Sequence, residues 1–268
     1  LLERGADSTK TNYEGCTPLH RATLYNKIPV IQELLEQGVD PNHKDSFGHT
    51  PLHFACSNNY IEAAVLLLAK GANPNESVTE YFGFTSLHIA AKKRHLYILE
   101  ALLEKGADPN KAGTEDGSTP LHIAVEEGHL DILEALLEKG ADPNKANGEE
   151  ATPLFLAVSK KQTSIVKALV EARCDTSIET KGESPLFMVA RKGDVDIVDI
   201  LLNNGADPNL ESSNDKSTPA EIAVWNGHTE VVKSMLDRGV DVNRHNHKKD
   251  GRTLLHSAAS RGYISIAK

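Results

Sequence analysis

The stretch TPLHIAVEEGHLDILEALLEKGAD at residues 119–142 decides the fold. Thr119 suits a helix N-cap because its hydroxyl accepts a hydrogen bond from an otherwise unpaired backbone N–H, and proline is tolerated at the following position. Leu121, Ala124 and Val125 then recur at helical spacing. The first part of the stretch is therefore predicted to be a short amphipathic helix.

A second apolar stripe follows the Gly-His dipeptide at residues 128–129. Between Ile132 and Leu137 the apolar residues again share one helical face. Gly140 is predicted to end this helix in the left-handed conformation, in which a Cβ would be strained. The unit is thus helix, tight turn, helix and a polar loop rich in Asp, Asn, Pro and Gly, and such a loop suits a hairpin-like excursion.

The same unit recurs along the whole chain of 268 residues. Thr-Pro-Leu-His or a variant of it begins at residues 17, 50, 85, 119, 152, 184, 218 and 253. A second word, Gly-Ala-Asp-Pro-Asn or a relative, keeps step with the first. Neither helix of a unit can bury its apolar stripe alone, so neighbouring units must stack on one another.

These two words in phase resemble an ankyrin-repeat array, and the resemblance covers essentially every residue. It implies an all-α fold, an ankyrin-repeat solenoid of stacked helix-turn-helix units joined by hairpin-like loops. We expect one ankyrin-repeat domain over residues 1–268, with 1–12 as the tail of a preceding repeat. First helices should start near residues 17, 50, 85, 119, 152, 184, 218 and 253, and the last repeat should be truncated.

Composition narrows the class of function. The chain has 29 Lys and Arg against 38 Asp and Glu, which disfavours nucleic acid and anionic membrane surfaces as partners. The longest apolar run, Ala63 to Ala69, is far shorter than the ~18 residues of a membrane span and fits a buried helix. Three widely spaced cysteines fit neither a disulfide framework nor a zinc site. We therefore expect an intracellular protein, cytoplasmic or nuclear.

Twelve histidines raise the question of a metal or catalytic site. Five occupy the fourth position of the repeated word, one in each of five repeats: His20, His53, His88, His122 and His256. Side chains distributed in this way cannot converge on one ion. In ankyrin repeats, which these residues resemble, this histidine ties the start of a helix to the neighbouring loop. His129 and His228, in the turn between helices, are assigned the same structural role.

The sequence contains no other chemical motif that specifies a reaction. His245 and His247 lack the ligand spacing of a structural zinc site, and no phosphate-binding loop, nucleophile elbow or zinc-binding helix is present. We predict that the chain is not an enzyme and has no catalytic residues, no metal site and no cofactor.

Two departures from the repeat predict a weaker region in repeats five to seven. Arg173 stands where other repeats have the helix-ending glycine, and Ala220 and Glu221 replace the usual Leu and His. A side chain at a left-handed position costs about 1 kcal/mol relative to glycine. Partial unfolding is therefore expected in place of one cooperative transition.

Aromatic residues concentrate at the variable positions of the first three repeats. Partners of ankyrin arrays commonly bind the concave face formed by loop tips and first helices, and aromatic side chains there are favoured binding hot spots. Phe82 or Phe84 has an alternative role in packing the array. The predicted partner-binding residues are Tyr13, Tyr25, Phe47, Tyr81, Phe82, Phe84, Lys92, Lys93 and Trp225.

The predicted function is a protein–protein interaction scaffold that is monomeric and inserts into no membrane. Lys92 and Lys93 beside the aromatic cluster favour an acidic, aromatic-rich peptide. One alternative is a regulatory or spacer arm of a longer enzyme, ion channel or toxin, and another is a mechanical solenoid. The resemblance also implies that an asparaginyl hydroxylase acts on the loop asparagines: Asn42, Asn75, Asn110, Asn144, Asn209 and Asn243.

Overall fold

A computed structural model of the chain describes residues 4–79, 83–246 and 251–268, and in these residues it is built of helices α1 to α16. The chain divides into two compact units, Leu1–Asp142 and Pro143–Lys268. In each unit a first helix and a second helix alternate, as the ankyrin resemblance implies, so the all-α prediction is confirmed.

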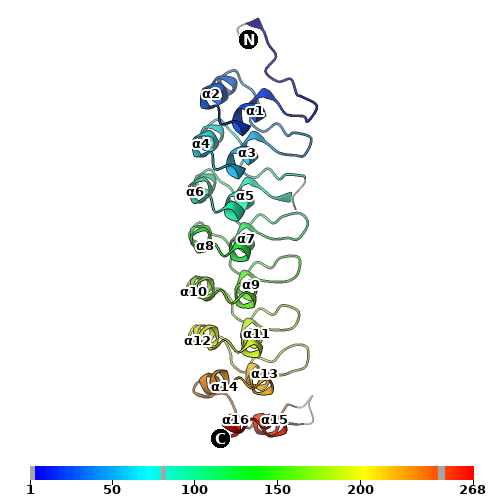
Figure 1. Cartoon of the computed structure of the whole chain (residues 1–268), viewed down its shortest axis with the longest axis vertical. Helices are drawn as coiled ribbons and strands as arrows, with labels where there is room; N and C mark the ends of the chain where they lie inside the picture. The colour runs from blue at the N-terminus through cyan, green and yellow to red at the C-terminus, as the bar shows by residue number, and fades with distance from the viewer. Residues whose placement is uncertain (1–3, 80–82, 247–250) are drawn as a thin grey trace. The chain divides into compact units, whose positions relative to one another are not determined.

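The first unit contains four helix pairs. Its first helices are α1 (Pro18–Leu24), α3 (Pro51–Ser57), α5 (Ser86–Lys93) and α7 (Pro120–Glu127). Its second helices are α2 (Ile28–Glu36), α4 (Ile61–Ala69), α6 (Leu96–Glu104) and α8 (Leu130–Glu138). Within this unit the first helices form one row, the second helices form another, and the long loops project from the first row on the side away from the second (Figure 1).

The second unit repeats this pattern. Its first helices are α9 (Pro153–Ser159), α11 (Pro185–Lys192), α13 (Pro219–Asn226) and α15 (Leu254–Arg261). Its second helices are α10 (Thr163–Glu171), α12 (Val195–Asn203), α14 (Thr229–Leu236) and α16 (Ile264–Ala267). Each first helix begins one residue after a Thr or Ser of the repeated word.

The helix starts follow from the chemistry of that word. Thr119 has an extended backbone and caps α7, and Pro120 occupies the first helical position, where no donor is needed. His122 completes the cap by accepting the Thr119 backbone N–H on its Nδ1 at 3.1 Å. The same reciprocal arrangement is present at Thr17, Thr50, Thr85 and Thr253.

The core consists of thin apolar layers between neighbouring helix pairs. Leu52, Leu87 and Leu121 are buried in the first row, and Ile98 and Ile132 are buried in the second. The residue five positions after the repeated Thr or Ser is a buried alanine in seven of the eight repeats, for example Ala55 and Ala90, and Val189 is the exception. Because the alanine side chain is small, α3 and α5 approach closely enough for their larger side chains to exclude water.

Helix ends behave as predicted at Gly140 and Arg173. Gly140 has φ +86° and Arg173 has φ +59°, so both lie in the left-handed region. The arginine has a Cβ that this conformation disfavours. Over the described residues, no helix is long and apolar enough to span a membrane.

Candidate functional site

The loop between α2 and α3 ends in a tight turn built on Asp45. The Asp45 carboxylate accepts the backbone N–H groups of Phe47 at 3.0 Å and His49 at 2.8 Å. The Asp45 backbone N–H donates to the His49 carbonyl at 2.9 Å, which closes the turn. This side-chain-to-backbone pattern is typical of Asp in turns. It leaves the Phe47 side chain exposed at the loop tip.

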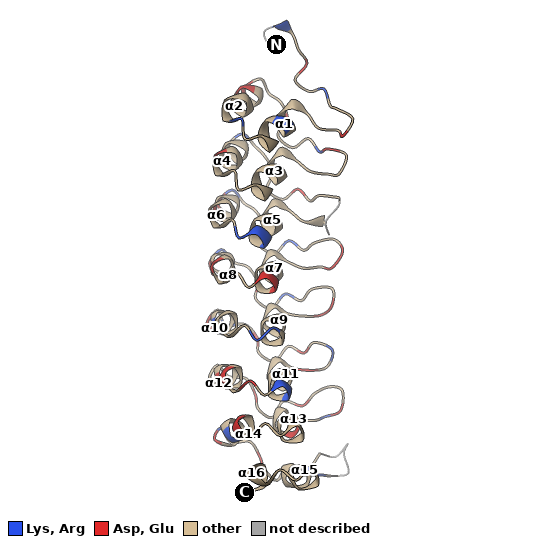
Figure 2. Ribbon diagram, viewed as in Figure 1, with Lys and Arg blue, Asp and Glu red and all other residues tan. Residues whose placement is uncertain are grey.

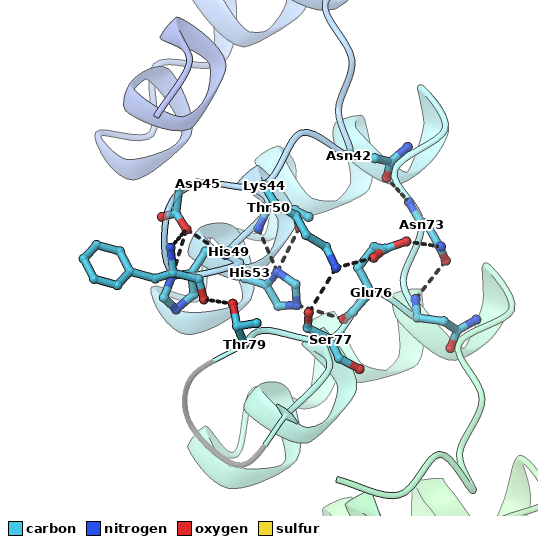
Figure 3. Close-up of polar contacts among 12 residues, drawn as sticks. Asn42, Lys44, Asp45, His49, Thr50, His53, Asn73, Glu76, Ser77 and Thr79 are labelled. Atoms are coloured by element: carbon cyan, nitrogen blue, oxygen red, sulfur yellow. Dashed lines mark hydrogen bonds and ion pairs between the residues drawn. The ribbon is translucent and has the colours of Figure 1, made fainter. Parts of the chain in front are cut away.

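Consecutive loop tips are joined to one another in the first unit. Thr79 donates to the Phe47 carbonyl from its backbone N–H at 3.2 Å and from its hydroxyl at 2.7 Å (Figure 3). Gly48, at φ +84°, lies directly beneath this contact, and a Cβ there would lie 2.6 Å from Thr79 N. Position 48 therefore requires glycine for two reasons: its φ is positive, and the next loop approaches too closely to leave room for a Cβ.

A buried histidine joins each of three first helices to the following loop. His53 Nδ1 accepts the Thr50 backbone N–H at 2.9 Å, so Nε2 carries the proton and donates to the Glu76 carbonyl at 3.0 Å (Figure 3). His20 and His88 make equivalent contacts of 3.1 Å with the carbonyls of His49 and Ser118. The predicted structural role of these three histidines is confirmed.

Burial keeps these histidines neutral. Desolvation is the largest cause that lowers the pKa of His53 to about 4 and that of His88 to about 4. The turn histidines are also structural, since His129 Nδ1 lies 3.0 Å from the Ala91 carbonyl and His228 Nε2 lies 3.0 Å from the Arg191 carbonyl.

Loop asparagines connect neighbouring repeats. Asn42 Nδ2 donates to the Gly71 carbonyl at 3.0 Å. Its Oδ1 accepts the Asn73 backbone N–H at 2.6 Å (Figure 3). Asn75 spans the next pair of loops in the same way, with contacts to Gly106 at 2.9 Å and Asp108 at 2.8 Å. These amides act as structural cross-links between repeats.

A hollow of about 410 Å³ opens on the first helices, between α3 and α5. Its lining combines aromatic rings, imidazoles, one aliphatic side chain and two lysines: His49, His53, Phe54, Ser57, Phe84, Ile89, Lys92 and Lys93. The Phe54 ring packs against His49, with ring centroids 5.5 Å apart. An apolar lining with a few polar groups at its edge is the usual character of a ligand-binding hollow.

Phe84 differs from the exposed tip residue that the sequence suggested. Its side chain is only 6% exposed and stacks on His88, with ring centroids 5.0 Å apart. Lys92 Nζ lies 5.9 Å from the centre of the Phe84 ring, within reach of a cation–π contact. Phe84 thus packs the array, which was the alternative role considered for it, and also lines the hollow.

The other predicted aromatic residues of the first unit fall into two groups. Tyr13, Tyr25 and Phe47 are exposed as expected, and Arg21 lies 5.0 Å above the Tyr25 ring. Tyr81 and Phe82 lie outside the described residues.

Trp225 belongs to the second unit and is separate from the other predicted contacts. It is 45% exposed, and the Arg261 guanidinium stacks 3.6 Å from the centre of its ring.

Phe54 and Ile89 were missed at the sequence level. Both lie four residues after the repeated Thr, a position that was not counted among the variable ones. A comparison of that position across repeats would have revealed the signal, because it is Arg21 in the first repeat and Phe54 in the second.

Charge is segregated along the first helices of the first unit. Figure 2 shows the C-terminal end of α5 in blue and that of α7 in red. Helix α5 ends in Lys92 and Lys93, which line the hollow, and α7 ends in Glu126 and Glu127. The hollow therefore has a cationic edge.

The described residues contain neither a reactive thiol nor a cluster of metal ligands. Cys16, Cys56 and Cys174 are buried free thiols, and burial raises the pKa of Cys56 to about 12 and that of Cys174 to about 12. In the part of the chain that the structure describes, no group of three or more His, Cys, Asp or Glu side chains is arranged to hold a metal ion.

The chain is similar to known repeat proteins over its entire length. A family model described as "Ankyrin repeats (3 copies)" matches residues 1–78, 25–112, 74–147, 145–212 and 205–268. The solved ankyrin repeat domain of Bcl-3, described as a unique member of the IkappaB protein family, superposes with a TM-score of 0.76. That match has 27% sequence identity and covers 83% of this chain and 99% of the other.

Curated relatives match over shorter segments. A transient receptor potential cation channel subfamily A member 1 homolog from Caenorhabditis elegans is 33% identical over 124 residues, which are 46% of this chain and 10% of the relative. Alpha-latrocrustotoxin-Lt1a from Latrodectus tredecimguttatus is 33% identical over 95 residues, 35% of this chain and 7% of the toxin. The nuclear factor NF-kappa-B p105 subunit from Gallus gallus is 33% identical over 119 residues, 43% of this chain and 12% of the relative. The chain thus spans a small fraction of these proteins.

Proposed function

We propose that this chain, which belongs to the ankyrin-repeat family, is a non-catalytic scaffold that binds a protein or peptide partner through its loop tips and first helices. The observation that carries this proposal is the hollow between α3 and α5, with its aromatic lining and its two lysines. Its volume of about 410 Å³ lies within the usual range of ligand-binding pockets, so it can admit a large apolar side chain of a partner.

The preferred partner is an acidic segment that carries an aromatic or large aliphatic residue. Phe54 and Ile89 offer apolar surface to that residue, and Lys92 and Lys93 offer charge to carboxylates on either side of it. Phe47 and Tyr13 extend the surface along the loop tips, where rigid aromatic rings bury large area at small entropic cost. Trp225 is a separate contact in the second unit.

This proposal is tested with a fluorescein-labelled peptide of alternating Glu and Phe, whose binding is followed by fluorescence anisotropy. The Lys92→Glu/Lys93→Glu variant should bind at least about tenfold more weakly, because it reverses the charge at the edge of the hollow. Phe47→Ala should weaken binding less, since its ring lies at the loop tip outside the hollow lining.

Two controls make the test specific. Tyr97→Asp, on a second helix, should leave the peptide affinity unchanged, and far-UV circular dichroism should be identical for all variants. Undiminished affinity of the lysine variant would exclude the hollow as the binding site.

A second candidate is an arm of a longer protein that contains other functional domains. The matched segments of the channel and the toxin are 10% and 7% of their lengths, so ankyrin repeats serve there as one part of a large chain. Determination of the full open reading frame tests this: a kinase, channel or toxin segment in the same frame supports it, and a frame of repeats alone contradicts it.

An intracellular setting completes the proposal. Three buried thiols without disulfide partners are compatible with a reducing compartment. Localisation of the full chain by microscopy of a fluorescent fusion tests it, and secretion of the fusion would contradict it.

A further inference from the structure

The second helix α4 departs from the pattern of its neighbours on the outer side of the first unit. Its sequence IEAAVLLLA is apolar almost all round, and a helix of this kind is normally buried on every side. The run Ala63 to Ala69 was therefore expected to be buried. Instead, Val65 is 46% exposed, Ile61 is 40% exposed and Ala69 is exposed as well.

Comparison of the repeats shows which positions of α4 are unusual. Val65 and Ala69 are the fifth and ninth residues of the helix. In α6 the same positions are Glu100 and Glu104, and both are exposed. The fifth and ninth positions of the other nine-residue second helices are polar: Gln32, Glu36, Glu100, Glu104, Glu134, Glu138, Lys167, Glu171, Asp199 and Asn203. In the eight-residue α14 the fifth residue is Lys233, and Asp237 follows the last residue of the helix.

Tyr97 enlarges the apolar surface on the adjacent helix. It is the second residue of α6 and is 72% exposed, whereas the second residue of α8 is Asp131. Helices α4 and α6 pack side by side (Figure 1). Residues Ile61, Val65, Ala69 and Tyr97 are called the outer patch below.

Negative charge predominates around the outer patch. Helices α2, α4 and α6 contain glutamates on their exposed sides and no Lys or Arg: Glu33, Glu36, Glu62, Glu100 and Glu104. Lysines occur only at the adjoining ends, at Lys27, Lys70 and Lys105. Among the described residues, none of these five glutamates forms an ion pair.

We propose that the outer patch docks a basic amphipathic helix of a partner protein. The apolar side of that helix would cover Val65, Ala69 and Tyr97, and its Lys or Arg residues would lie against the surrounding glutamates. Exposed apolar surface rimmed by charge marks an interaction site. The excess of glutamate on these three helices favours a cationic partner and disfavours anionic membranes.

This surface is independent of the hollow between α3 and α5. The two sites lie on different helices and have rims of opposite charge, since the hollow carries Lys92 and Lys93. A scaffold with both would hold an acidic segment and a basic helix at once. Loss of one site should therefore leave the other intact.

The probe for this test is a labelled synthetic helix of about 18 residues, long enough to cross α2, α4 and α6 at about 10 Å per helix. It has Leu at helical spacing on one side and Lys on the other. Binding to the full chain is measured by fluorescence anisotropy. The Val65→Glu/Ala69→Glu/Tyr97→Asp variant should bind at least about tenfold more weakly. The fold should accept these changes because Glu and Asp already occupy the same positions in α8.

A second variant separates charge from apolar contact. Glu100→Gln/Glu104→Gln should weaken binding and should reduce its dependence on ionic strength, because two of the attracting charges are removed. Glu126→Gln/Glu127→Gln is the matched control, because it removes the same number of charges from a first helix, α7, and should leave the affinity for the basic helix undiminished.

Four outcomes would overturn the proposal. The first is that the Val65→Glu/Ala69→Glu/Tyr97→Asp variant binds the basic probe as tightly as the parent chain does. The second is that a probe with Glu in place of Lys binds the parent chain as tightly as the basic probe does. The third is binding to vesicles of anionic lipid that depends on the outer patch. The fourth is that the parent chain forms a dimer in sedimentation analysis and the triple variant does not. That result would assign the outer patch to contact with a second copy of the chain.

Discussion

His53 Nε2 lies 3.0 Å from the carbonyl oxygen of Glu76, and this single contact joins the start of α3 to the loop of the next repeat. The opposite ring nitrogen is occupied by the Thr50 N–H. Both nitrogens are thus engaged in the neutral form, and a proton on Nδ1 would break the cap. The contact between His88 and Ser118 has the same geometry one repeat later.

Stability should therefore fall as pH decreases from about 6.5 to about 4. The pKa of His53 and that of His88 are each lowered to about 4 in the folded chain, from the ordinary value of 6.5 for histidine. Between these values the unfolded chain binds more protons, so each histidine should reduce the free energy of unfolding by up to about 1.4 kcal/mol per pH unit. Urea unfolding followed by circular dichroism at a series of pH values measures this slope.

The His53→Gln/His88→Gln variant is the control for this slope. Glutamine can still complete the helix cap but does not titrate. The variant should be less sensitive to pH in this window, although carboxylates still titrate. A slope equal to that of the parent chain would show that these histidines do not control the pH dependence.

Gly48→Ala should destabilise the chain more than Gly38→Ala. Both glycines have φ near +80°, so each substitution costs about 1 kcal/mol from backbone conformation. A Cβ at position 38 meets nothing within 4 Å, whereas one at position 48 collides with Thr79. That collision should add about 1 to 3 kcal/mol. Urea denaturation compares the two, and equal losses would contradict the close approach of the loops.

Arg173→Gly should stabilise the second unit by up to about 1 kcal/mol, because glycine accepts the φ of +59° without a Cβ. Trp225 is the chain's one tryptophan and lies in this unit, so its fluorescence during urea unfolding reports the change. Gly140→Arg is the reverse substitution in the first unit and should leave the Trp225 transition less affected. An unshifted transition in Arg173→Gly would exclude strain at this position.

Arg244→Ala should cost about 2 kcal/mol in the second unit, as is typical for hydrogen bonds to charged groups. Glu221 stands where other repeats have the capping histidine, and it accepts from Arg244 Nη1 at 2.9 Å and from Asn246 Nδ2 at 2.6 Å. Arg244 also pairs with Glu211. Loss of the guanidinium leaves the mostly buried Glu221 carboxylate with fewer donors.

Lys216→Ala is the matched control for Arg244→Ala. Lys216 pairs with Glu211 at 3.9 Å and is more exposed than Arg244, so its removal should change stability by less than about 1 kcal/mol. Trp225 fluorescence during urea unfolding measures both variants. A cost for Lys216→Ala equal to that for Arg244→Ala would show that burial of the pair is unimportant.

Much of the fold was predictable because each signal is local. The Thr-Pro pair starts a helix through its own hydroxyl and ring, as at Thr119 and Pro120, whatever surrounds it. The left-handed conformation of Arg173 was likewise evident from its alignment with glycines. The structural role of His53 followed from its recurrence, since one histidine per repeat cannot form a shared site.

The candidate sites were less predictable because exposure depends on neighbours. Phe84 was expected at a loop tip, yet it stacks on His88 and is buried. Val65 was expected within a buried helix, yet it is exposed. Neither outcome is encoded in the residue itself, because the same side chain is buried or exposed according to what the next repeat places against it.

The amino-acid sequence alone determined the repeat, the positions of helix starts and the assignment of the histidines, because these depend on interactions within a few residues. Only the tertiary structure decided which aromatic rings line the hollow between α3 and α5 and which apolar residues of α4 remain exposed. The physical reason is that burial belongs to the layer between two repeats, and the sequence of one repeat does not state how closely its neighbour approaches.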